Sequence, residues 1–472
     1  MKRKNGSAPR RRSHIILVPG FGGFDALGRI EYYSGITRLF QNWLDDHPDV
    51  RVVLHYFDNL PTAAVVTRAS RLRKYIAKRI ARREIAPGET IVLVGHSTGG
   101  LDIRQLLWDL HHPDSPVVPV DGGLPVAVEE IRGCIDGVVF LSVPHWGTNI
   151  AEWVYRHSVL RTAVTTDLQA AFEGSRLYLI DSLEAGVADG AAGLTGAEIL
   201  LALRDALTEA NDDWSGDATR ISDAQEAASD LQLYFRQMAT NFHVIEDLSP
   251  VPHSRQRSPA HFSNEEREEE LESWENPHIR ILSYATVGGR AVQFRSGCSA
   301  PVFSLANPLD DLAVLQACGQ SAGTDIGYRL CYRACAGGPF EIPKMAGSIG
   351  RVLGPLPPVP LQVWDNDGIV NTLSMLWPGN GNVLVQADHL DIVGHYHLRP
   401  ERPEAYKEGI VPPPPRTFES YDTLKSSPQF EQKVFDKVWQ EIFFFAALPK
   451  ALSKYAPTRK AVTVAAAARP AR

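Results

Sequence analysis

The sequence has no long apolar run. No stretch approaches the roughly 18 consecutive apolar residues that a membrane-spanning helix requires. The basic amino-terminal segment MKRKNGSAPRRRS is not followed directly by the apolar core of a secretory signal peptide. The next apolar stretch, IILVPGFGGF, is short and is interrupted by proline and glycine, which suits a buried strand better. We therefore expect a cytoplasmic protein without a transmembrane segment.

An excess of positive charge is missing as well. The chain has 48 Lys and Arg residues against 55 Asp and Glu residues, which gives a formal net charge of −7. Proteins whose main partner is nucleic acid usually present an excess of basic residues to the phosphates. The composition therefore argues against a nucleic-acid partner. The hydrophobic fraction of 44% is ordinary for a globular protein and allows a sizeable core.

Cysteine is scarce, and its number is odd. An odd count argues against a complete disulfide framework. Four of the five cysteines lie between residues 298 and 335, but their spacing fits no common zinc pattern. We expect free thiols and no metal ion or cofactor; the alternative is one or two disulfides in an exported protein. The five residues are Cys134, Cys298, Cys318, Cys331 and Cys335.

Strand and helix patterns alternate along the first third of the chain, which predicts an α/β fold with a mostly parallel sheet and helices on both faces. The alternation stops after Pro144, where helical patterns dominate, and strand patterns return at 279–287, 361–368 and 381–389. The acidic stretch NEEREEELESWENP reads as a solvated loop or helix face. The expected division is a disordered tail at 1–13, the first core part at 14–150, a mostly helical cap insertion at 151–278, the second core part at 279–455 and a disordered tail at 456–472.

The pentapeptide GHSTG, residues 95–99, directly follows the apolar run IVLV. A serine nucleophile must project from a sharp strand-to-helix turn, and glycines on both sides let strand and helix approach closely. This context predicts Ser97 as a nucleophile, the alternative being a glycine-rich turn with an incidental serine. The backbone N–H of Thr98 would then lie at a helix N-terminus, where a developing oxyanion is stabilised. The turn LVPGFGG at the end of the first strand supplies the N–H of Phe21 as the second expected oxyanion donor.

An acid and then a histidine are expected after late strands, because hydrolases with this serine turn place their residues in that order. The segment LQVWDNDGIVN supplies Asp367 as the acid, with Asp365 as its competitor and a simple Asp-Gly turn as the alternative. The segment VLVQADHLDIVGHYH supplies His389 as the base. His395 and His397 lie farther from the expected end of the strand.

The motifs GHSTGG, LSVPHWGTNIAEW, DNDGIVNTLSM and DHLDIVG together resemble the bacterial true lipases of the α/β-hydrolase superfamily, in particular the staphylococcal and thermophilic-bacillus type. The resemblance implies an α/β-hydrolase fold, Ser97 as nucleophile, Asp367 as acid, His389 as base and the insertion as a lid. Pro19 stands where that family usually has a histidine. Asp391 matches one calcium ligand of the family, but HYH stands where a second aspartate would follow, and zinc ligands have no counterpart.

The sequence thus predicts a serine hydrolase of carboxylic esters, a lipase or carboxylesterase, that uses no cofactor. The expected partner is a small-molecule or lipid ester, with transient contact between the cap and a lipid interface. An acyltransferase would carry the same three residues, and a thioesterase or polyester depolymerase is a further alternative. A non-catalytic binding protein on this scaffold would have no need to keep all three residues.

Overall fold

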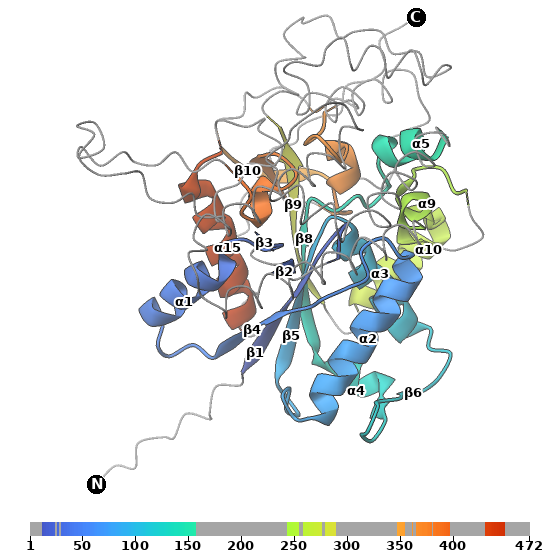
Figure 1. The fold of residues 1–472 in the computed structure, drawn as a ribbon, viewed down its shortest axis with the longest axis vertical. Coiled ribbons are helices and arrows are strands. Elements are labelled where there is room, and N and C mark those ends of the chain that lie inside the picture. The colour runs from blue at the N-terminus through green and yellow to red at the C-terminus, as the bar shows by residue number, and fades with distance from the viewer. Residues whose placement is uncertain are drawn as a thin grey trace, which may run out of the picture.

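A seven-stranded parallel sheet forms the centre of the structure (Figure 1). Its strand order is β10-β11-β9-β8-β5-β1-β4, and every neighbouring pair is parallel. The strands are β1 (Ser13–Val18), β4 (Val52–Tyr56), β5 (Thr90–His96), β8 (Ile135–Leu141), β9 (Arg280–Val287), β10 (Ile349–Leu353) and β11 (Asn382–Gln386). This computed structural model describes residues 12–23, 26–27, 30–156, 243–253, 258–275, 279–288, 347–354, 361, 365–379, 381–396 and 430–448.

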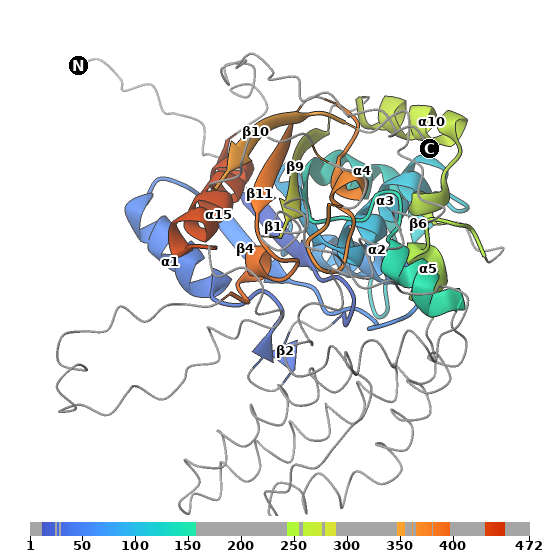
Figure 2. The same ribbon diagram turned by 90° about the horizontal axis from the view of Figure 1, so that it is seen from above.

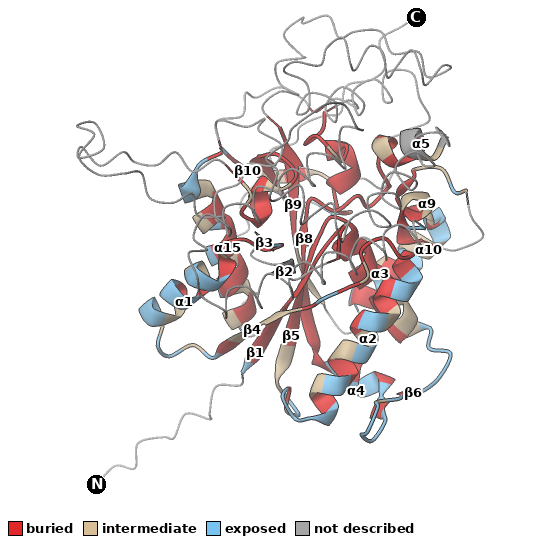
Figure 3. Cartoon of the chain, in the orientation of Figure 1, coloured by how far each residue is buried: buried red, intermediate tan, exposed pale blue. Residues whose placement is uncertain are grey.

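Helices cover both faces of the sheet (Figure 2). On one face lie α1 (Ile36–Asp46) and α15 (Gln432–Ala447); on the other lie α2 (Val65–Ala81), α3 (Thr98–His111), α4 (Val128–Cys134) and α10 (Asn264–Glu275). Side chains of a strand point alternately to the two faces. Accordingly, Ile15 and Leu17 of β1 pack in the core with α1 and α15, whereas Ile16 and Val18 pack in the core with α2 and α3. The central strands are therefore buried almost throughout (Figure 3).

Small elements complete the described fold. Two-stranded ribbons are formed by β2 (Ala26–Leu27) with β3 (Ile30–Glu31) and by β6 (Val117–Val118) with β7 (Val126–Ala127). Short helices are α5 (Asn149–Arg156), α9 (Val244–Leu248), η1 (Pro259–His261), η2 (Thr372–Met375) and η3 (Asp391–Val393). In the described part of the chain, no helix is long and apolar enough to cross a membrane.

The parallel sheet with helices on both faces confirms the predicted α/β-hydrolase fold. One expected strand is wrong at its end: residues 365–368 form a turn, in which the Asp367 N–H donates to the Val370 carbonyl at 3.2 Å. β11 pairs with β9 on one side and with β10 on the other, and the apolar pattern of the sequence did not predict β10. Of the expected cap at 151–278, residues 157–242, 254–257 and 276–278 lie outside the described residues, as do the two expected tails apart from Arg12 and Ser13.

The acidic stretch near the end of that insertion forms helix α10, which packs against the sheet layer. Its buried residues Glu270 and Trp274 face α3 and β8: Glu270 pairs with Arg104 of α3, and the Trp274 ring lies 5.9 Å from the Phe140 ring. The rest of its surface is acidic and largely exposed. The stretch is thus a helix with a solvated face and one buried edge.

Candidate active site

Ser97 lies in a strained backbone conformation between β5 and α3. Its φ is 52° and its ψ is −128°, and it is one of three non-glycine residues with positive φ in the described part of the chain. Such conformations cost free energy and persist only where the surroundings enforce them, as they often do at functional sites. Ser97 is 5% exposed and lies at the carboxyl end of β5. The local geometry is therefore the sharp strand-to-helix turn that the sequence predicts.

Glycines around the turn let three backbone segments meet. A Cβ atom on Gly95 would lie 2.7 Å from the Gly100 nitrogen, and one on Gly100 would lie 2.1 Å from a methyl group of Val143. A Cβ atom on Gly99 would lie 2.3 Å from the Val18 carbonyl oxygen. These separations are far below van der Waals contact, so only glycine fits at all three positions.

Asp367 and His389 form a buried pair at the same edge of the sheet. The His389 Nδ1 lies 2.7 Å from Asp367 Oδ2, and the His389 backbone N–H donates to the Asp367 carbonyl at 3.0 Å. Asp367 is fully buried and His389 is 2% exposed. The other Asp367 oxygen, Oδ1, accepts from the backbone N–H groups of Ile369 and Val370. The structure thus places Asp367, rather than Asp365, on the histidine.

Thr286, at the end of β9, is a further partner of this carboxylate that sequence reasoning missed. Its hydroxyl donates to Asp367 Oδ2 at 2.6 Å and lies 2.8 Å from the Ser142 hydroxyl. Thr286, His389 and the backbone N–H groups of Ile369 and Val370 therefore fix the orientation of the Asp367 carboxylate. Only the position of Thr286 and Ser142 at strand ends could have indicated them in the sequence.

His96 connects the serine turn with the His389 segment. Its Nε2 lies 2.9 Å from the His389 carbonyl oxygen, and the two imidazole rings lie 4.7 Å apart. Since a carbonyl only accepts, Nε2 carries the proton, and Nδ1 accepts from the Tyr32 hydroxyl at 2.7 Å. Burial, followed by the charge of His389, holds the pKa of His96 well below its usual value of 6.5. The neutral His96 ring thus links the residue next to Ser97 to the backbone of His389.

The turn after β1 lies directly against the serine. A Cβ atom on Gly20 would lie 2.7 Å from the Ser97 Cβ and 2.5 Å from the Tyr32 hydroxyl. Phe21 follows in this turn, and Thr98 is the first residue of α3, a position whose N–H has no partner inside an α-helix. Both expected oxyanion donors therefore belong to segments that meet at Ser97. The His395 Nε2 lies 3.0 Å from the Tyr32 carbonyl oxygen. His397 lies outside the described residues.

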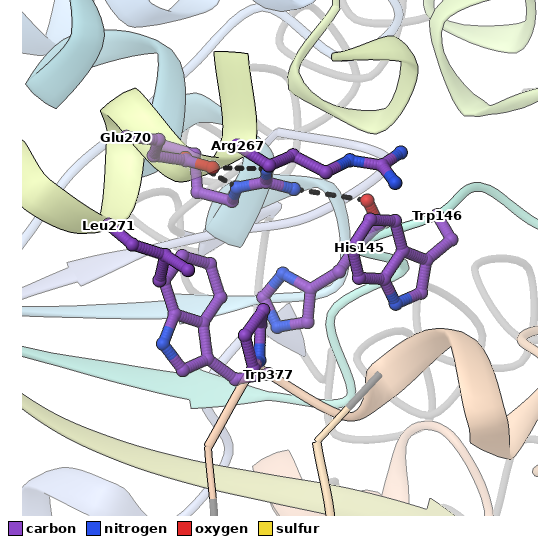
Figure 4. A pocket seen from close by; sticks show the side chains of 8 residues that line it. His145, Trp146, Arg267, Glu270, Leu271 and Trp377 are labelled. Carbon is purple, nitrogen blue, oxygen red and sulfur yellow. Dashed lines mark hydrogen bonds and ion pairs between the residues drawn. The ribbon is translucent and has the colours of Figure 1, made fainter. Parts of the chain in front are cut away.

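A second buried polar cluster lies on the α3 face, where α10 meets the β8 end (Figure 4). Arg104 donates to both Glu270 oxygens, at 2.8 and 2.6 Å, and to the His145 carbonyl at 3.0 Å. Burial and the Arg104 charge hold the pKa of His145 well below its usual value, so this ring is neutral. The cluster leaves no room for a water molecule. The Arg104–Glu270 pair therefore joins α3 to α10.

The residues considered for metal and thiol chemistry have local roles where they are described. Asp391 Oδ2 accepts from the Asp388 backbone N–H at 2.7 Å, which closes the turn that contains His389. The described residues contain no group of three or more side chains able to hold a metal ion together. Cys134 is a buried free thiol, and the other four cysteines lie outside the described residues.

Comparison with known proteins gives structural likenesses only. Neither a protein-family model nor a curated protein matches this chain. The Staphylococcus hyicus lipase is 13% identical, with a TM-score of 0.42 over 96% of this chain and 100% of that one. EstA from Clostridium botulinum is 18% identical, with a TM-score of 0.37 over 90% of each chain. Lipase 1 from Pelosinus fermentans is 14% identical, with a TM-score of 0.37 over 82% of this chain and 94% of that one. At these scores the likenesses carry no argument about activity.

Proposed function

We propose that the protein is a serine hydrolase of carboxylic esters, of lipase or carboxylesterase type. The observation that carries the proposal is the strained backbone of Ser97 together with the buried Asp367–His389 pair, to which the neighbouring His96 is hydrogen-bonded. In this assignment Ser97 is the nucleophile, His389 the general base and Asp367 the acid that orients the imidazole. The resemblance of the four sequence motifs to bacterial true lipases supports the lipase type.

The state of the imidazole suits it to act as a base. Because Asp367 accepts the Nδ1 proton of His389, the lone pair of the neutral ring is on Nε2. In the proposed reaction this nitrogen takes the proton of the Ser97 hydroxyl while its oxygen attacks the ester carbonyl. The Asp367 carboxylate stabilises the imidazolium that forms, and Thr286 and the turn amides keep it in place.

The tetrahedral intermediate needs donors for its negative oxygen. We assign these to the backbone N–H groups of Phe21 and Thr98, on the two segments that meet at Ser97. The intermediate collapses when the bond to the alcohol oxygen breaks and His389 gives that oxygen its proton. A water molecule, deprotonated by His389, then attacks the acyl-enzyme, and the departing Ser97 oxygen regains a proton.

The direct test is hydrolysis of p-nitrophenyl esters of increasing acyl length by the wild-type chain and by Ser97→Ala. We expect turnover to fall by at least about 10⁴-fold in the folded variant. A folded Ser97→Ala protein with turnover within about tenfold of wild type would remove Ser97 from the mechanism. Repeating the assay with an added alcohol and analysing the products separates hydrolysis from acyl transfer to that alcohol.

A further inference from the structure

Arg68 is unlike the other basic residues of α2. The helix carries Arg71, Lys74 and Lys78 on its exposed side, which the sequence shows as one strongly basic face (Figure 3). Arg68, in contrast, is fully buried and donates to the carbonyl oxygen of Gly20 in the turn that follows β1. Fully buried arginines are rare unless every donor finds a partner. The contacts of Arg68 show what this side chain does.

One end of the guanidinium holds the turn that carries Phe21. Arg68 Nη2 donates to the carbonyl oxygens of Pro19 and Gly20, both at 2.9 Å. The Gly20 carbonyl and the Phe21 N–H belong to one planar peptide group, and no described peptide bond is cis. The two groups therefore point in opposite directions. A cation that fixes the carbonyl fixes the direction of the N–H as well, and it polarises the peptide so that the N–H becomes a stronger donor.

The same guanidinium also holds the helix that carries Thr98, because Nη2 pairs with Asp102 Oδ2 at 2.9 Å as well. Arg68 Nε lies 3.0 Å from both oxygens of Asp102, which belongs to α3 one helical turn after Thr98. The remaining nitrogen of Arg68, Nη1, donates to the Leu60 and Pro61 carbonyl oxygens. Asp102 also accepts from the Asn59 amide at 3.1 Å. One rigid, planar group thus ties the turn at Gly20 to the helix whose first residue follows the serine. The two proposed oxyanion donors are set by the same side chain.

Stability alone does not account for this pair. Both side chains are fully buried, and burial raises the pKa of the Asp102 carboxyl to about 6, although Arg68 and Asn59 act in the opposite direction. Removing two charges from water costs so much that apolar residues of similar volume often serve stability as well or better. A buried pair that also reaches two carbonyls of a functional turn is better explained by the position it enforces.

We propose that Arg68 is a positioning residue that aligns the Phe21 and Thr98 N–H groups as one oxyanion site. The inference rests on the proposed ester hydrolysis, because the oxyanion exists only in that reaction. Lysine cannot replace Arg68, since an ammonium group lacks the planar fork that reaches a carboxylate and two carbonyls together. The arrangement of Asp102 and the turn carbonyls thus requires arginine.

The test compares Arg68→Lys and Arg68→Met with Arg71→Met, a change of the same kind on the exposed side of α2. For each folded variant, kcat and KM are measured on a p-nitrophenyl ester. The inhibition constant of a trifluoromethyl ketone, which forms an oxyanion on the serine, is measured as well. We expect kcat to fall by about 10²- to 10³-fold in the Arg68 variants, as on loss of an oxyanion donor, with KM nearly unchanged. Ketone affinity should fall in parallel, while Arg71→Met behaves as wild type.

Arg68→Lys keeps the charge and most of the volume, so it decides the question if Arg68→Met does not fold. The inference is overturned if folded Arg68→Lys keeps kcat and ketone affinity within about threefold of wild type. It is also overturned if KM rises while kcat stays constant, because the arginine would then affect substrate binding alone. Failure of the proposed function is distinguishable, since the wild-type chain would then hydrolyse no ester and bind no ketone covalently.

Discussion

Gly99→Ala tests how closely the turn at Ser97 and the turn after β1 are packed. A Cβ atom at this position would lie 2.3 Å from the Val18 carbonyl oxygen, 2.7 Å from the Pro19 carbonyl oxygen and 3.0 Å from the Pro19 carbonyl carbon. All three atoms belong to the backbone, so no side-chain rotation can relieve the contact. The end of β1 and the start of the turn after it must therefore move away from position 99.

The size of the effect follows from these distances. The shortest contact is about 1.1 Å inside the 3.4 Å at which ordinary contacts begin, and a misplacement of about 1 Å can cost about 10²-fold in rate. Overpacking of this kind costs roughly 1–3 kcal/mol of unfolding free energy. We therefore expect a folded, destabilised variant whose kcat/KM on a p-nitrophenyl ester falls by about 10²-fold.

The matched control is Gly133→Ala in α4, where an added Cβ atom would meet nothing within 4 Å. Alanine is a better helix residue than glycine by roughly 0.5–1 kcal/mol, so this variant should be equally or more stable and fully active. Urea unfolding and ester hydrolysis are measured for both. If Gly99→Ala matches Gly133→Ala in stability and kcat/KM, the two turns are not packed as described.

Four further results are expected. Thr286→Val should lower kcat by about tenfold at nearly constant KM, because the Asp367 carboxylate loses one of its donors; an unchanged kcat would show that the hydroxyl is dispensable. Asp367→Asn should lower kcat by about 10⁴-fold, whereas Asp365→Asn should be much milder; the reverse order would exchange their roles. Burial lowers the pKa of His55 to about 4 in the folded protein. As the pH falls from 6.5 towards 4, His55 therefore becomes protonated in the unfolded chain but not in the folded one, and the free energy of unfolding decreases. His55→Gln should therefore reduce the pH dependence of urea unfolding across this range, by less than about 1.4 kcal/mol per pH unit because the ring is partly exposed. EDTA should leave the melting temperature nearly unchanged; a fall of several degrees that calcium reverses would reveal a missed site.

Features with a local cause could be predicted from the sequence. Each buried parallel strand needs an unbroken apolar run, and the helix after it needs apolar residues at helical spacing, so the core alternation is visible in the letters. The turn at Ser97 is visible for the same reason, because only glycine tolerates the close approach of strand and helix there. Asp367 and His389 follow Ser97 along the chain in the expected order, and in the structure their side chains lie 2.7 Å apart.

Features that depend on contacts between distant parts of the chain could not be predicted from the sequence. β10 reads IGRVL, too short and too mixed to be distinguished from a loop, and it is stabilised by pairing with β11. In the sequence Arg68 cannot be distinguished from the exposed Arg71, and only the packing of α2 against the turn after β1 separates the two. Glu270 is one acid among many in its helix and becomes buried because Arg104 lies opposite. In each case the partner is distant in sequence, so no periodicity reveals it.

The central claim is that Ser97 is a nucleophile activated by His389. The most direct measurement is reaction of the wild-type chain with a fluorophosphonate, which phosphonylates activated serines, followed by mass spectrometry of the peptides. Our account predicts one equivalent of label, carried by Ser97, with loss of ester hydrolysis in proportion to labelling. A chain that hydrolyses esters while its label lies on another residue, or while Ser97 stays unmodified, would contradict it.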